Sequence, residues 1–323
     1  MKRKKILVTG GAGYVGTRFC NEYINNYDIT VIDNFWFGDL LDERITKIKK
    51  DIKELTVSDV EGYDAVLFLA GLSNDPMAMY RPDLNFIENS AVPTYLAYIT
   101  KQAGIKKFIC ASSCSVYGHT VNKSLTESSK VKPSYAYGVA KLQCEKGITI
   151  LEDDKFKPIL FRKGTVGGWS ERMRYDLVIN TMLMTAFTKK KIIVNSPKLW
   201  RPLIDIRDVI RAYSIAIECD SEISGVYNLS GGNYTIGELG KIIHKSLVNR
   251  GYDIELEYLD VKDVRNYKVG TSKIEDELEF VSKYKPTDTV EEILKNINLD
   301  TYDFTNNKHY NINVFREVIW KYC

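Results

Sequence analysis

The chain has 323 residues and a formal net charge of +3, with 44% hydrophobic and 27% charged residues. This composition is typical of a globular protein, and so small a charge argues against nucleic acid or an anionic membrane as a partner. No apolar run approaches the roughly 18 residues of a membrane span, the start MKRKK does not resemble a signal peptide, and the six cysteines lack metal-ligand spacing, so we expect a cytoplasmic protein with reduced thiols and no metal.

Short apolar segments alternate with amphipathic ones through the first two-thirds of the chain. Strands are predicted over 5–10, 28–34, 50–55, 65–71, 107–113 and 158–164. Helices are predicted over 13–24, 89–104 and 133–146, the last with Ser134 as its N-cap. Strands that alternate with helices of this size imply right-handed crossovers and a parallel sheet.

After Thr165 the alternation becomes less regular. Helices are predicted over 176–190 and 235–249, a strand followed by a helix over 201–218, and a further strand over 225–231. Thr235 and Glu238 have the spacing of a capping box, while no chemistry is assigned to the aromatic, Asn-rich tail 301–323. We expect an α/β fold, a Rossmann-type doubly wound parallel sheet with a smaller interleaved C-terminal lobe. Residues 1–165 form its NAD-binding domain, with a return segment near 203–228, and 166–323 mainly the substrate-binding lobe.

A glycine-rich stretch, TGGAGYVG, follows the first predicted strand and opens the first predicted helix. Its glycines permit a tight turn and a close approach of the backbone to a pyrophosphate at the helix N-terminus. The second strand ends at Asp33, 17 residues after Gly16, where a carboxylate accepts ribose hydroxyls and repels a ribose phosphate. This context predicts NAD rather than NADP. Asp51 and Ile52 are expected to flank the adenine, although Asp51 is equally consistent with a solvated loop acid.

Tyr137 and Lys141 lie four residues apart in the predicted helix 133–146, and therefore on one face of it. Alone, such a pair indicates a packing tyrosine and a solvated lysine. Beside a dinucleotide, however, a lysine ammonium and an oxidised nicotinamide ring both stabilise the phenolate, which makes the tyrosine a base. The pair predicts that Tyr137 takes the proton of a sugar or alcohol hydroxyl while hydride leaves for NAD, and that Lys141 also holds the nicotinamide ribose.

Eight motifs occur in the order that one family of enzymes shows: TGGAGYVG, VIDN, LFLAG, ASSCSVYG, YGVAK, GTVGG, RPLIDIRD and VYNLSGG. Over residues 4–295 the chain resembles an extended short-chain dehydrogenase/reductase of the NAD-dependent nucleotide-sugar epimerase/dehydratase family, with most similarity to the UDP-glucose 4-epimerases. The resemblance implies a nucleotide-diphosphate sugar as the partner, a homodimer, and catalysis by Ser113, Tyr137 and Lys141. For Ser113 the alternative is a strand-end hydroxyl bonded to its own backbone.

The resemblance also extends the expected binding residues. With the motifs above, the expected NAD contacts are Gly10, Gly13, Tyr14, Val15, Gly16, Asp33, Asn34, Asp51, Ile52, Ala70, Gly71, Asn89, Tyr137 and Lys141. The expected substrate contacts are Ser113, Ser115, Thr165, Asn180, Arg201 and Arg265. Arginine forks suit a diphosphate well, although a surface salt bridge is an alternative for Arg201 and Arg265.

Departures from the family pattern bear on the reaction. Cys114 and Ser115 stand where dehydratases carry an Asp–Glu pair and decarboxylases a glutamate, which disfavours both reactions and favours 4-epimerisation. Thr165 and Gly167 replace the residues common in 4-epimerases. Cys114 keeps open a 3,5-epimerase or 4-keto-sugar reductase, although a buried inert cysteine is the simpler interpretation. His119 is either a proton donor or an exposed loop residue. A non-catalytic NAD-binding regulatory protein is the alternative from another class.

Overall fold

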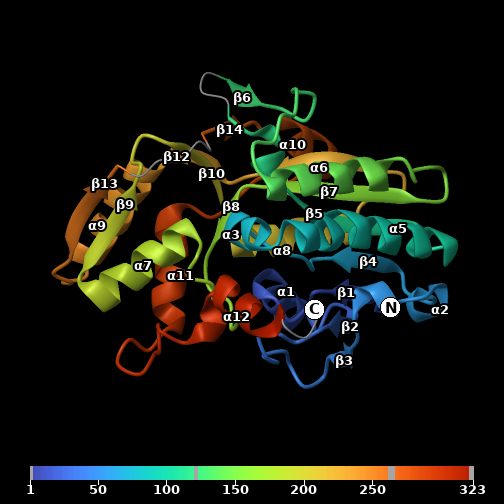
Figure 1. Ribbon diagram of the computed structural model, residues 1–323, viewed down its shortest axis with the longest axis horizontal. Helices are drawn as coiled ribbons and strands as arrows, with labels where there is room; N and C mark the ends of the chain where they lie inside the picture. Colours follow the sequence, from blue (N-terminus) through green and yellow to red (C-terminus); the bar gives the residue numbers. More distant parts are fainter. Residues whose placement is uncertain (1–2, 120–122, 261–265, 320–323) are drawn as a thin grey trace.

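A computed structural model describes residues 3–119, 123–260 and 266–319 of the chain (Figure 1). Its largest element is a sheet of seven parallel strands in the order β11-β7-β5-β4-β1-β2-β3. The strands are β1 (Lys5–Thr9), β2 (Asp28–Asp33), β3 (Thr46–Lys49), β4 (Ala65–Phe68), β5 (Lys107–Ser113), β7 (Lys157–Lys163) and β11 (Gly225–Leu229). The predicted Rossmann-type doubly wound sheet is confirmed.

The predicted position of the third strand, over 50–55, is wrong. β3 ends at Lys49, and the segment 50–55 follows it as a 3₁₀ turn, η1 (Ile52–Glu54). The Asp51 side chain caps this turn by accepting a hydrogen bond of 3.0 Å from the backbone N–H of Lys53. A carboxylate that bonds the backbone two residues on favours a turn over a continuing strand, which explains the correction.

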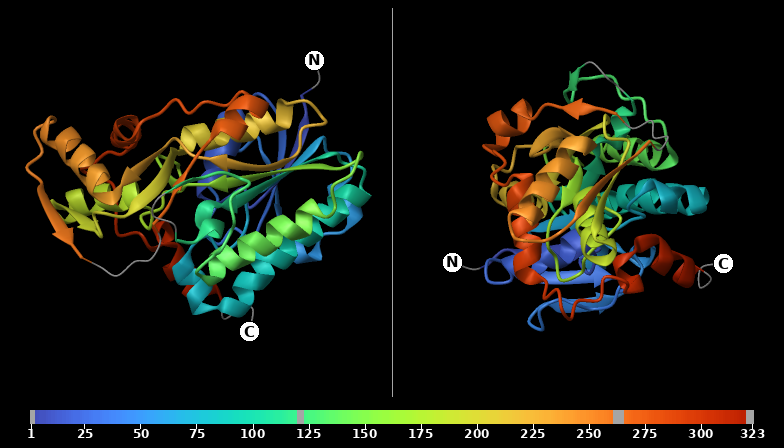
Figure 2. Two further views of the ribbon diagram at one scale, coloured as in Figure 1. Left: turned by 90° about the horizontal axis from the view of Figure 1, so that it is seen from above. Right: turned by 90° about the vertical axis from the view of Figure 1, so that its left-hand side faces the viewer.

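Helices cover both faces of the sheet, which Figure 2 shows edge-on. The helices of this part are α1 (Tyr14–Tyr23), α2 (Val57–Val60), α3 (Asp75–Tyr80), α4 (Pro82–Phe86), η2 (Ile87–Ala91), α5 (Val92–Gln102), η3 (Cys114–Tyr117), α6 (Ala136–Thr149) and α8 (Ile206–Glu218). Ile6 and Val8 belong to the hydrophobic core under α1 and α8, whereas Leu7 belongs to the core under α5. Alternating strand residues thus supply two cores, as a doubly covered parallel sheet requires.

The start of α6 differs from the prediction. The helix begins at Ala136, and its N-cap is Tyr135 rather than Ser134, without a side-chain cap hydrogen bond. The first turn of α6 packs closely on the segment after β5, because a Cβ atom on Gly138 would lie 2.6 Å from the carbonyl oxygen of Ser115. The capping signal of a serine is weak beside tertiary packing of this kind.

The second lobe is smaller and lies on one side of the sheet (Figure 1). It contains α7 (Val178–Lys189), β9 (Lys191–Asn195), α9 (Ile236–Val248), β13 (Glu255–Leu259) and α11 (Pro286–Asn296), whereas α10 (Ser272–Leu278) packs on β11 of the main sheet. A three-stranded sheet of β8 (Thr165–Gly167), β10 (Trp200–Asp205) and β12 (Gly232–Thr235) connects the lobe to the main sheet, while β6 (Ser124–Leu125) pairs with β14 (Lys268–Val269). The capping box of Thr235 and Glu238 is present.

Within the predicted return segment 203–228, α8 packs on α1 and β5, and β11 joins the edge of the main sheet. Its first residues, 203–205, belong instead to β10. None of the helices in the described ranges has the length and apolar character that a membrane crossing requires.

The C-terminal tail folds back onto the first domain. After η4 (Asn307–His309), helix α12 (Asn311–Val318) contacts α3, far along the chain. The aromatic residues before α12 surround the buried ring of Tyr175, whose neighbours are Tyr302, Phe304, His309 and Tyr310. The tail is therefore packed structure that closes one side of the molecule.

Candidate active site

Two cavities meet at the carboxyl edge of the main sheet, where ligands bind in doubly wound folds. We name them the glycine-loop cavity, of about 170 Å³, and the Tyr137 cavity, of about 680 Å³. Both are lined by Tyr14, Val15, Ser73, Lys163 and Arg174, which form the boundary between them. A ligand in one cavity therefore lies next to a ligand in the other.

Backbone forms much of the glycine-loop cavity. Gly10 has a φ of +77°, and a Cβ atom there would lie 2.4 Å from the backbone nitrogen of Ala70. A Cβ on Gly16 would lie 2.6 Å from the Gly10 carbonyl oxygen. Most of the expected cofactor residues line this cavity: Gly10, Gly13, Tyr14, Val15, Gly16, Asp33, Asn34, Asp51, Ile52, Ala70 and Gly71. The glycines leave space that any side chain would fill, as a dinucleotide turn requires.

Asp33 ends β2 at the floor of this cavity. Its Oδ2 accepts a hydrogen bond of 3.0 Å from Ala12 N–H, and its Oδ1 accepts one of 2.7 Å from Phe35 N–H. Burial raises the pKa of the Asp33 carboxyl, and the hydrogen bonds from the backbone partly offset this effect. The carboxylate is thus held in one orientation, with lone pairs left for the hydroxyls of a ribose.

Two expected cofactor residues act from behind the cavity. Asn89 is buried and donates hydrogen bonds of 2.8 Å to Leu72 O and Asn85 Oδ1, and a Cβ on Gly71 would come within 2.3 Å of the Asn89 Oδ1. Asn89 was expected to contact NAD, but it lines neither cavity and instead supports the loop after β4. Lys141 is also buried and donates a hydrogen bond of 3.0 Å from Nζ to Ala111 O.

The Tyr137 cavity gathers the expected catalytic hydroxyls. Ser113, at the end of β5, and Tyr137, in the first turn of α6, both line it. Ser115 donates a backbone hydrogen bond of 3.1 Å to Ser113 Oγ, which in turn lies 3.1 Å from Ser115 Oγ. Lys141 Nζ lies 5.9 Å from the centroid of the Tyr137 ring. Ser115, Thr165 and Arg201 also line this cavity, on its substrate side.

Several expected residues lie elsewhere. Asn180 is buried outside both cavities, where its Oδ1 accepts from Gly168 N–H (3.1 Å) and its Nδ2 donates to Arg174 O (2.9 Å), so its amide is used within the protein. Cys114 faces away from Ser113 and donates from Sγ to Arg162 O at 3.0 Å, and burial raises its thiol pKa. Cys114 is thus the buried, inert cysteine. His119 is exposed and lines neither cavity, and Arg265 lies outside the described residues.

The site is also lined by cationic side chains that the sequence analysis did not identify. Lys163 lies beside Ser113 across the β5–β7 pair, and burial, followed by the charges of Lys141 and Arg174, lowers its pKa to about 7. Arg174 holds Asp176 with two hydrogen bonds of 2.9 and 2.7 Å. Arg172 and Asn311 line the glycine-loop cavity opposite the glycines. Lys163 is the last residue of the buried strand β7, and residues at strand ends line the ligand cavity in a parallel sheet.

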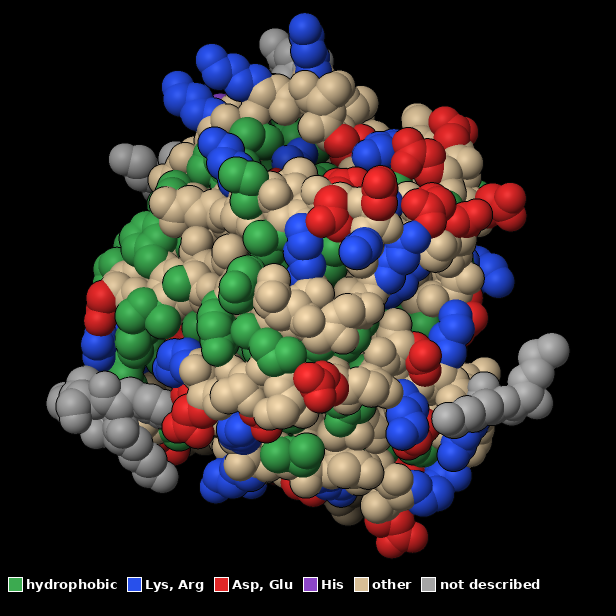
Figure 3. Space-filling model, turned by 90° about the vertical axis from the view of Figure 1, so that its right-hand side faces the viewer, with side chains coloured by type: hydrophobic (Ala, Val, Ile, Leu, Met, Phe, Trp, Pro, Cys, Tyr) green, Lys and Arg blue, Asp and Glu red, His purple; other side chains and the backbone are tan. Residues whose placement is uncertain are grey.

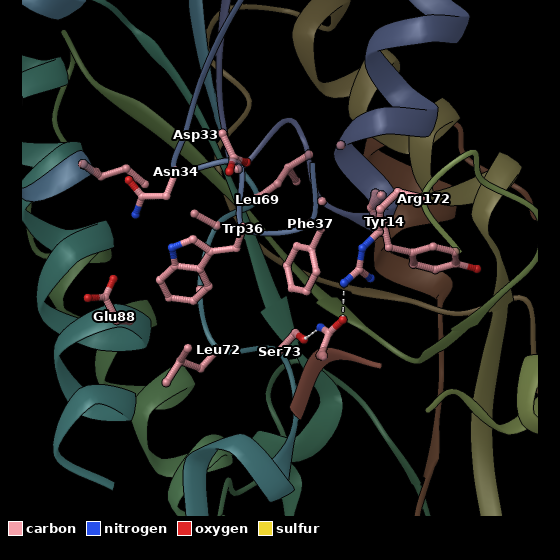
Figure 4. A pocket seen from close by; sticks show the side chains of 18 of the residues that line it. Tyr14, Asp33, Asn34, Trp36, Phe37, Leu69, Leu72, Ser73, Glu88 and Arg172 are labelled. Carbon is pink, nitrogen blue, oxygen red and sulfur yellow. Dashed lines mark hydrogen bonds between the residues drawn. The ribbon is translucent and has the colours of Figure 1, made fainter. Parts of the chain in front are cut away.

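The glycine-loop cavity fits a dinucleotide. Its glycines leave room at the N-terminus of α1, Asp33 stands ready for a ribose, and the buried Arg172 has a donor, Nε, without a hydrogen-bond partner in the described structure (Figure 4). An anionic ligand at a helix N-terminus beside an arginine is favourable for two independent reasons.

Similar proteins of known function support this interpretation. The chain is 30% identical over 177 residues to UDP-glucose 4-epimerase 3 of Oryza sativa subsp. japonica, and 30% identical over 162 residues to UDP-glucose 4-epimerase of Bacillus subtilis. These alignments cover 49% and 44% of this chain and 48% and 46% of those proteins, so the chain spans about half the length of the curated relatives it matches.

A solved structure covers much more of the chain. The UDP-N-acetylglucosamine 4-epimerase of Methanobrevibacter ruminantium M1, in complex with UDP-N-acetylmuramic acid, has a TM-score of 0.82 and 26% identity, over 92% of this chain and 100% of that one. The UDP-glucuronic acid 4-epimerase of Bacillus cereus shares the fold, with a TM-score of 0.79 at 24% identity, over 89% and 97% of the two chains. The family model "NAD dependent epimerase/dehydratase family" matches residues 6–230. This chain belongs to that family, and its cofactor is NAD.

Proposed function

We propose that this protein is an NAD-dependent nucleotide-sugar 4-epimerase. The observation that carries the proposal is the meeting of Ser113 and Tyr137 on the wall of one large cavity that adjoins the glycine-loop cavity, with the ammonium of Lys141 buried behind the tyrosine. A cavity of about 680 Å³ lies within the size range of sites that enclose small organic ligands.

Each catalytic side chain has one task in this proposal. Tyr137 takes the proton of the sugar 4-hydroxyl, and Ser113 donates a hydrogen bond to the same oxygen. The glycine loop and Asp33 would hold NAD, which would supply a reversible hydride acceptor for the sugar carbon. Burial disfavours the charged form of Lys141, but the neighbouring Tyr137 and the groups around it outweigh this effect and raise the pKa of Lys141. The ammonium therefore stays charged at neutral pH and stabilises the phenolate of Tyr137.

The rival reactions have less support. A cysteine acid would need to face the sugar, and Cys114 points instead toward the backbone of Arg162. The positions where a dehydratase carries its acidic pair hold Cys114 and Ser115. The carboxylate of Asp176 does line the Tyr137 cavity, but Arg174 and Asn74 bind it, which makes it a poor proton carrier.

We assign the binding of the sugar nucleotide mainly to the second lobe, residues 166–323 without the return segment 203–228. The ends of the strands of the main sheet complete this binding site. Arg201 on β10 is buried, lines the Tyr137 cavity and donates a hydrogen bond of 2.9 Å to Trp200 O. Its guanidinium suits the diphosphate. Thr165 and Ser115 line the same cavity and are placed for sugar hydroxyls.

We also propose a homodimer. Exposed apolar side chains occur on α4, η2, α5 and the end of α6: Phe86, Ile87, Tyr95, Tyr98 and Ile150. Figure 3 shows one flank of the molecule, on which hydrophobic side chains gather toward one edge. Apolar patches of this kind favour association between proteins. Sedimentation of the purified chain tests this: a monomer at micromolar concentration would contradict it.

Turnover without a reductant tests the reaction. The purified chain should interconvert the two C4 epimers of a nucleotide hexose, followed by proton NMR across a panel of UDP-, dTDP- and GDP-hexoses, without added NADH. Product that forms in proportion to added NADH or NADPH would favour the keto-sugar reductase. NAD binding without turnover of any member of the panel would favour the non-catalytic regulatory protein.

A further inference from the structure

Arg172 is a buried cation in the glycine-loop cavity. Only 3% of its surface is exposed, and its guanidinium carbon lies 3.6 Å from the centroid of the Phe37 ring. One of its nitrogens, Nη2, donates a hydrogen bond to Asn311 Oδ1, whereas Nε has no hydrogen-bond partner in the described structure. Figure 4 shows this side chain between Tyr14 and Phe37, on the wall of the cavity.

Asn311 connects Arg172 to the opposite side of the cavity mouth. It is the first residue of α12, and its Nδ2 donates a hydrogen bond of 2.6 Å to Ser73 Oγ, in the loop after β4 (Figure 4). Asn311 itself lines the cavity. The asparagine therefore links Arg172 to the loop after β4 at the edge of the cavity.

Apolar contacts hold α12 in this position. The ring of Phe315 packs against Trp36 at 6.0 Å and against Tyr80 at 6.2 Å between centroids. Phe315 and Ile319 share a buried cluster with Leu72 and Met77. The C-terminal helix is thus anchored both to the loop after β2 and to α3, which flank the cavity.

The carboxylates of Asp176 and Asp33 act on the charge of Arg172 only from a distance. No ion pair within 4 Å joins Arg172 to a carboxylate in the described structure. Burial, followed by the charge of Arg174, lowers the pKa of Arg172 to about 9. A buried charge without a close ion pair is costly, so an anion in the cavity would be strongly favoured.

The N-terminus of α1 and Arg172 both favour an anionic group of the ligand in the glycine-loop cavity. Gly13, Tyr14 and Val15 bring the N-terminus of α1 to the cavity, where an anion is stabilised. Arg172 lines this cavity but not the Tyr137 cavity, which separates it from the diphosphate of the sugar nucleotide. The pyrophosphate is the anionic part of a dinucleotide.

We propose that Arg172 binds the pyrophosphate of the dinucleotide and that α12, through Asn311, holds the guanidinium in place. The C-terminal helix is then part of the cofactor site, although the family model ends at residue 230. The inference rests on the dinucleotide site and is independent of which sugar reaction the enzyme catalyses.

Calorimetric titration of the full-length chain, freed of bound nucleotide, tests this inference with ADP and with adenosine. ADP carries the pyrophosphate and adenosine lacks it. Arg172→Met should weaken ADP binding about 10- to 100-fold, the usual loss for a hydrogen bond to a charged group, and leave adenosine binding unchanged. Asn311→Ala should act in the same direction with a smaller loss. Asn313→Ala, which alters a neighbouring residue of α12 that bonds Asn307 and does not line the cavity, is the matched control.

The two ligands separate recognition from folding. An equal loss of ADP and adenosine affinity in Arg172→Met, or no loss of either, would overturn the proposal. If Arg172→Met fails to fold, Arg172→Lys provides the test, because it retains the charge without the fork that stacks on Phe37. It should keep full adenosine affinity and lose part of the ADP affinity; undiminished ADP affinity would contradict the role of the guanidinium. An enzyme without epimerase activity that still shows the ADP effect would contradict only the proposed reaction.

Discussion

The two cavities that meet at the carboxyl edge of the sheet differ in the atoms that line them. In the glycine-loop cavity, backbone packs on backbone, as where Gly10 meets Ala70 and Gly16 meets Gly10. The Tyr137 cavity is lined by side chains from both lobes, including Met182 on α7, Ile193 on β9 and Arg201 on β10. Backbone contacts tolerate almost no added atom, whereas side chains can be exchanged with small shifts of their neighbours.

This difference bears on how easily substitutions change the shape of each cavity. The part of the glycine-loop cavity that backbone forms has little freedom to change shape. A cavity walled by side chains from α7, β9 and β10 changes shape with few substitutions, so related enzymes on one fold accept different sugars. We therefore expect changes in the two cavities to have separable effects.

Loss of the Tyr137 phenol should greatly reduce turnover and leave the glycine-loop cavity unchanged. Tyr137→Phe removes the proposed base, and turnover should fall about 10²–10⁴-fold. Affinity for the nucleotide sugar should change little, because the diphosphate is held by other residues. Tyr135→Phe, in the same cavity, is the control and should retain most of the activity. Equal epimerisation rates for Tyr137→Phe and the parent would remove the tyrosine from the mechanism.

A methyl group on the glycine loop should damage the whole fold as well as the cofactor site. Gly10 and Gly62 both have positive φ, of +77° and +83°, but a Cβ on Gly62 meets no atom within 4 Å. Gly62→Ala should cost about 1–2 kcal/mol in the free energy of unfolding, from backbone strain alone. Gly10→Ala adds a clash with the backbone of Ala70 and should cost about 2–5 kcal/mol. Urea unfolding measures both; equal losses would show that the close approach of the loop does not matter.

The choice of cofactor should depend on one carboxylate. Asp33→Asn removes the charge and keeps one of the two acceptors that bind Ala12 and Phe35. We expect NAD affinity to fall by about tenfold and NADP binding to rise, since the repulsion of the ribose phosphate is gone. Asp51→Asn, in the same cavity, should leave the ratio of the two affinities unchanged. If the unaltered protein already prefers NADP, then Asp33 does not hold the ribose.

Local sequence signals were sufficient for the glycine turn, for the acid at the end of β2 and for the pairing of Tyr137 with Lys141. The turn after β1, the acid at the end of β2 and the spacing of Tyr137 and Lys141 each lie within one segment, so their geometry follows from a strand, a turn or a helix. The misplaced third strand also has a local cause, the cap that Asp51 makes. Ser134 was the wrong cap, since α6 begins at Ala136 after Tyr135. A capping signal is weak beside tertiary packing such as that of Gly138 on Ser115.

Contacts between distant segments account for what the sequence did not predict. Arg172 and Asn311 are 139 residues apart, and nothing near either residue indicates that they meet over a cofactor. Asn180 was expected to bind the diphosphate, yet the backbone of Gly168 and Arg174 takes up the hydrogen bonds of its amide. Residue type shows what a side chain is able to bind, and tertiary packing decides what it meets.

Lys163 stands where the two cavities join, and its effect should appear in the pH dependence of stability. The pKa of Lys163 is lowered to about 7, chiefly by burial, so between pH 7 and its ordinary value near 10.5 the unfolded chain binds a proton that the folded chain does not. The free energy of unfolding should therefore fall as pH decreases through that range and then level off below pH 7.

Lys163→Met removes this proton linkage. The variant should be more stable than the parent at pH 7, by a few degrees in Tm, and the two should converge toward pH 10. Lys157→Met, at the other end of β7, is the control and should keep the slope of the parent. Calorimetric scans from pH 6 to 10 measure the difference. A parent and a Lys163→Met variant with parallel profiles would show that Lys163 remains charged in the folded protein. The boundary between the cavities would then carry a permanent positive charge, which would attract anionic groups from either side.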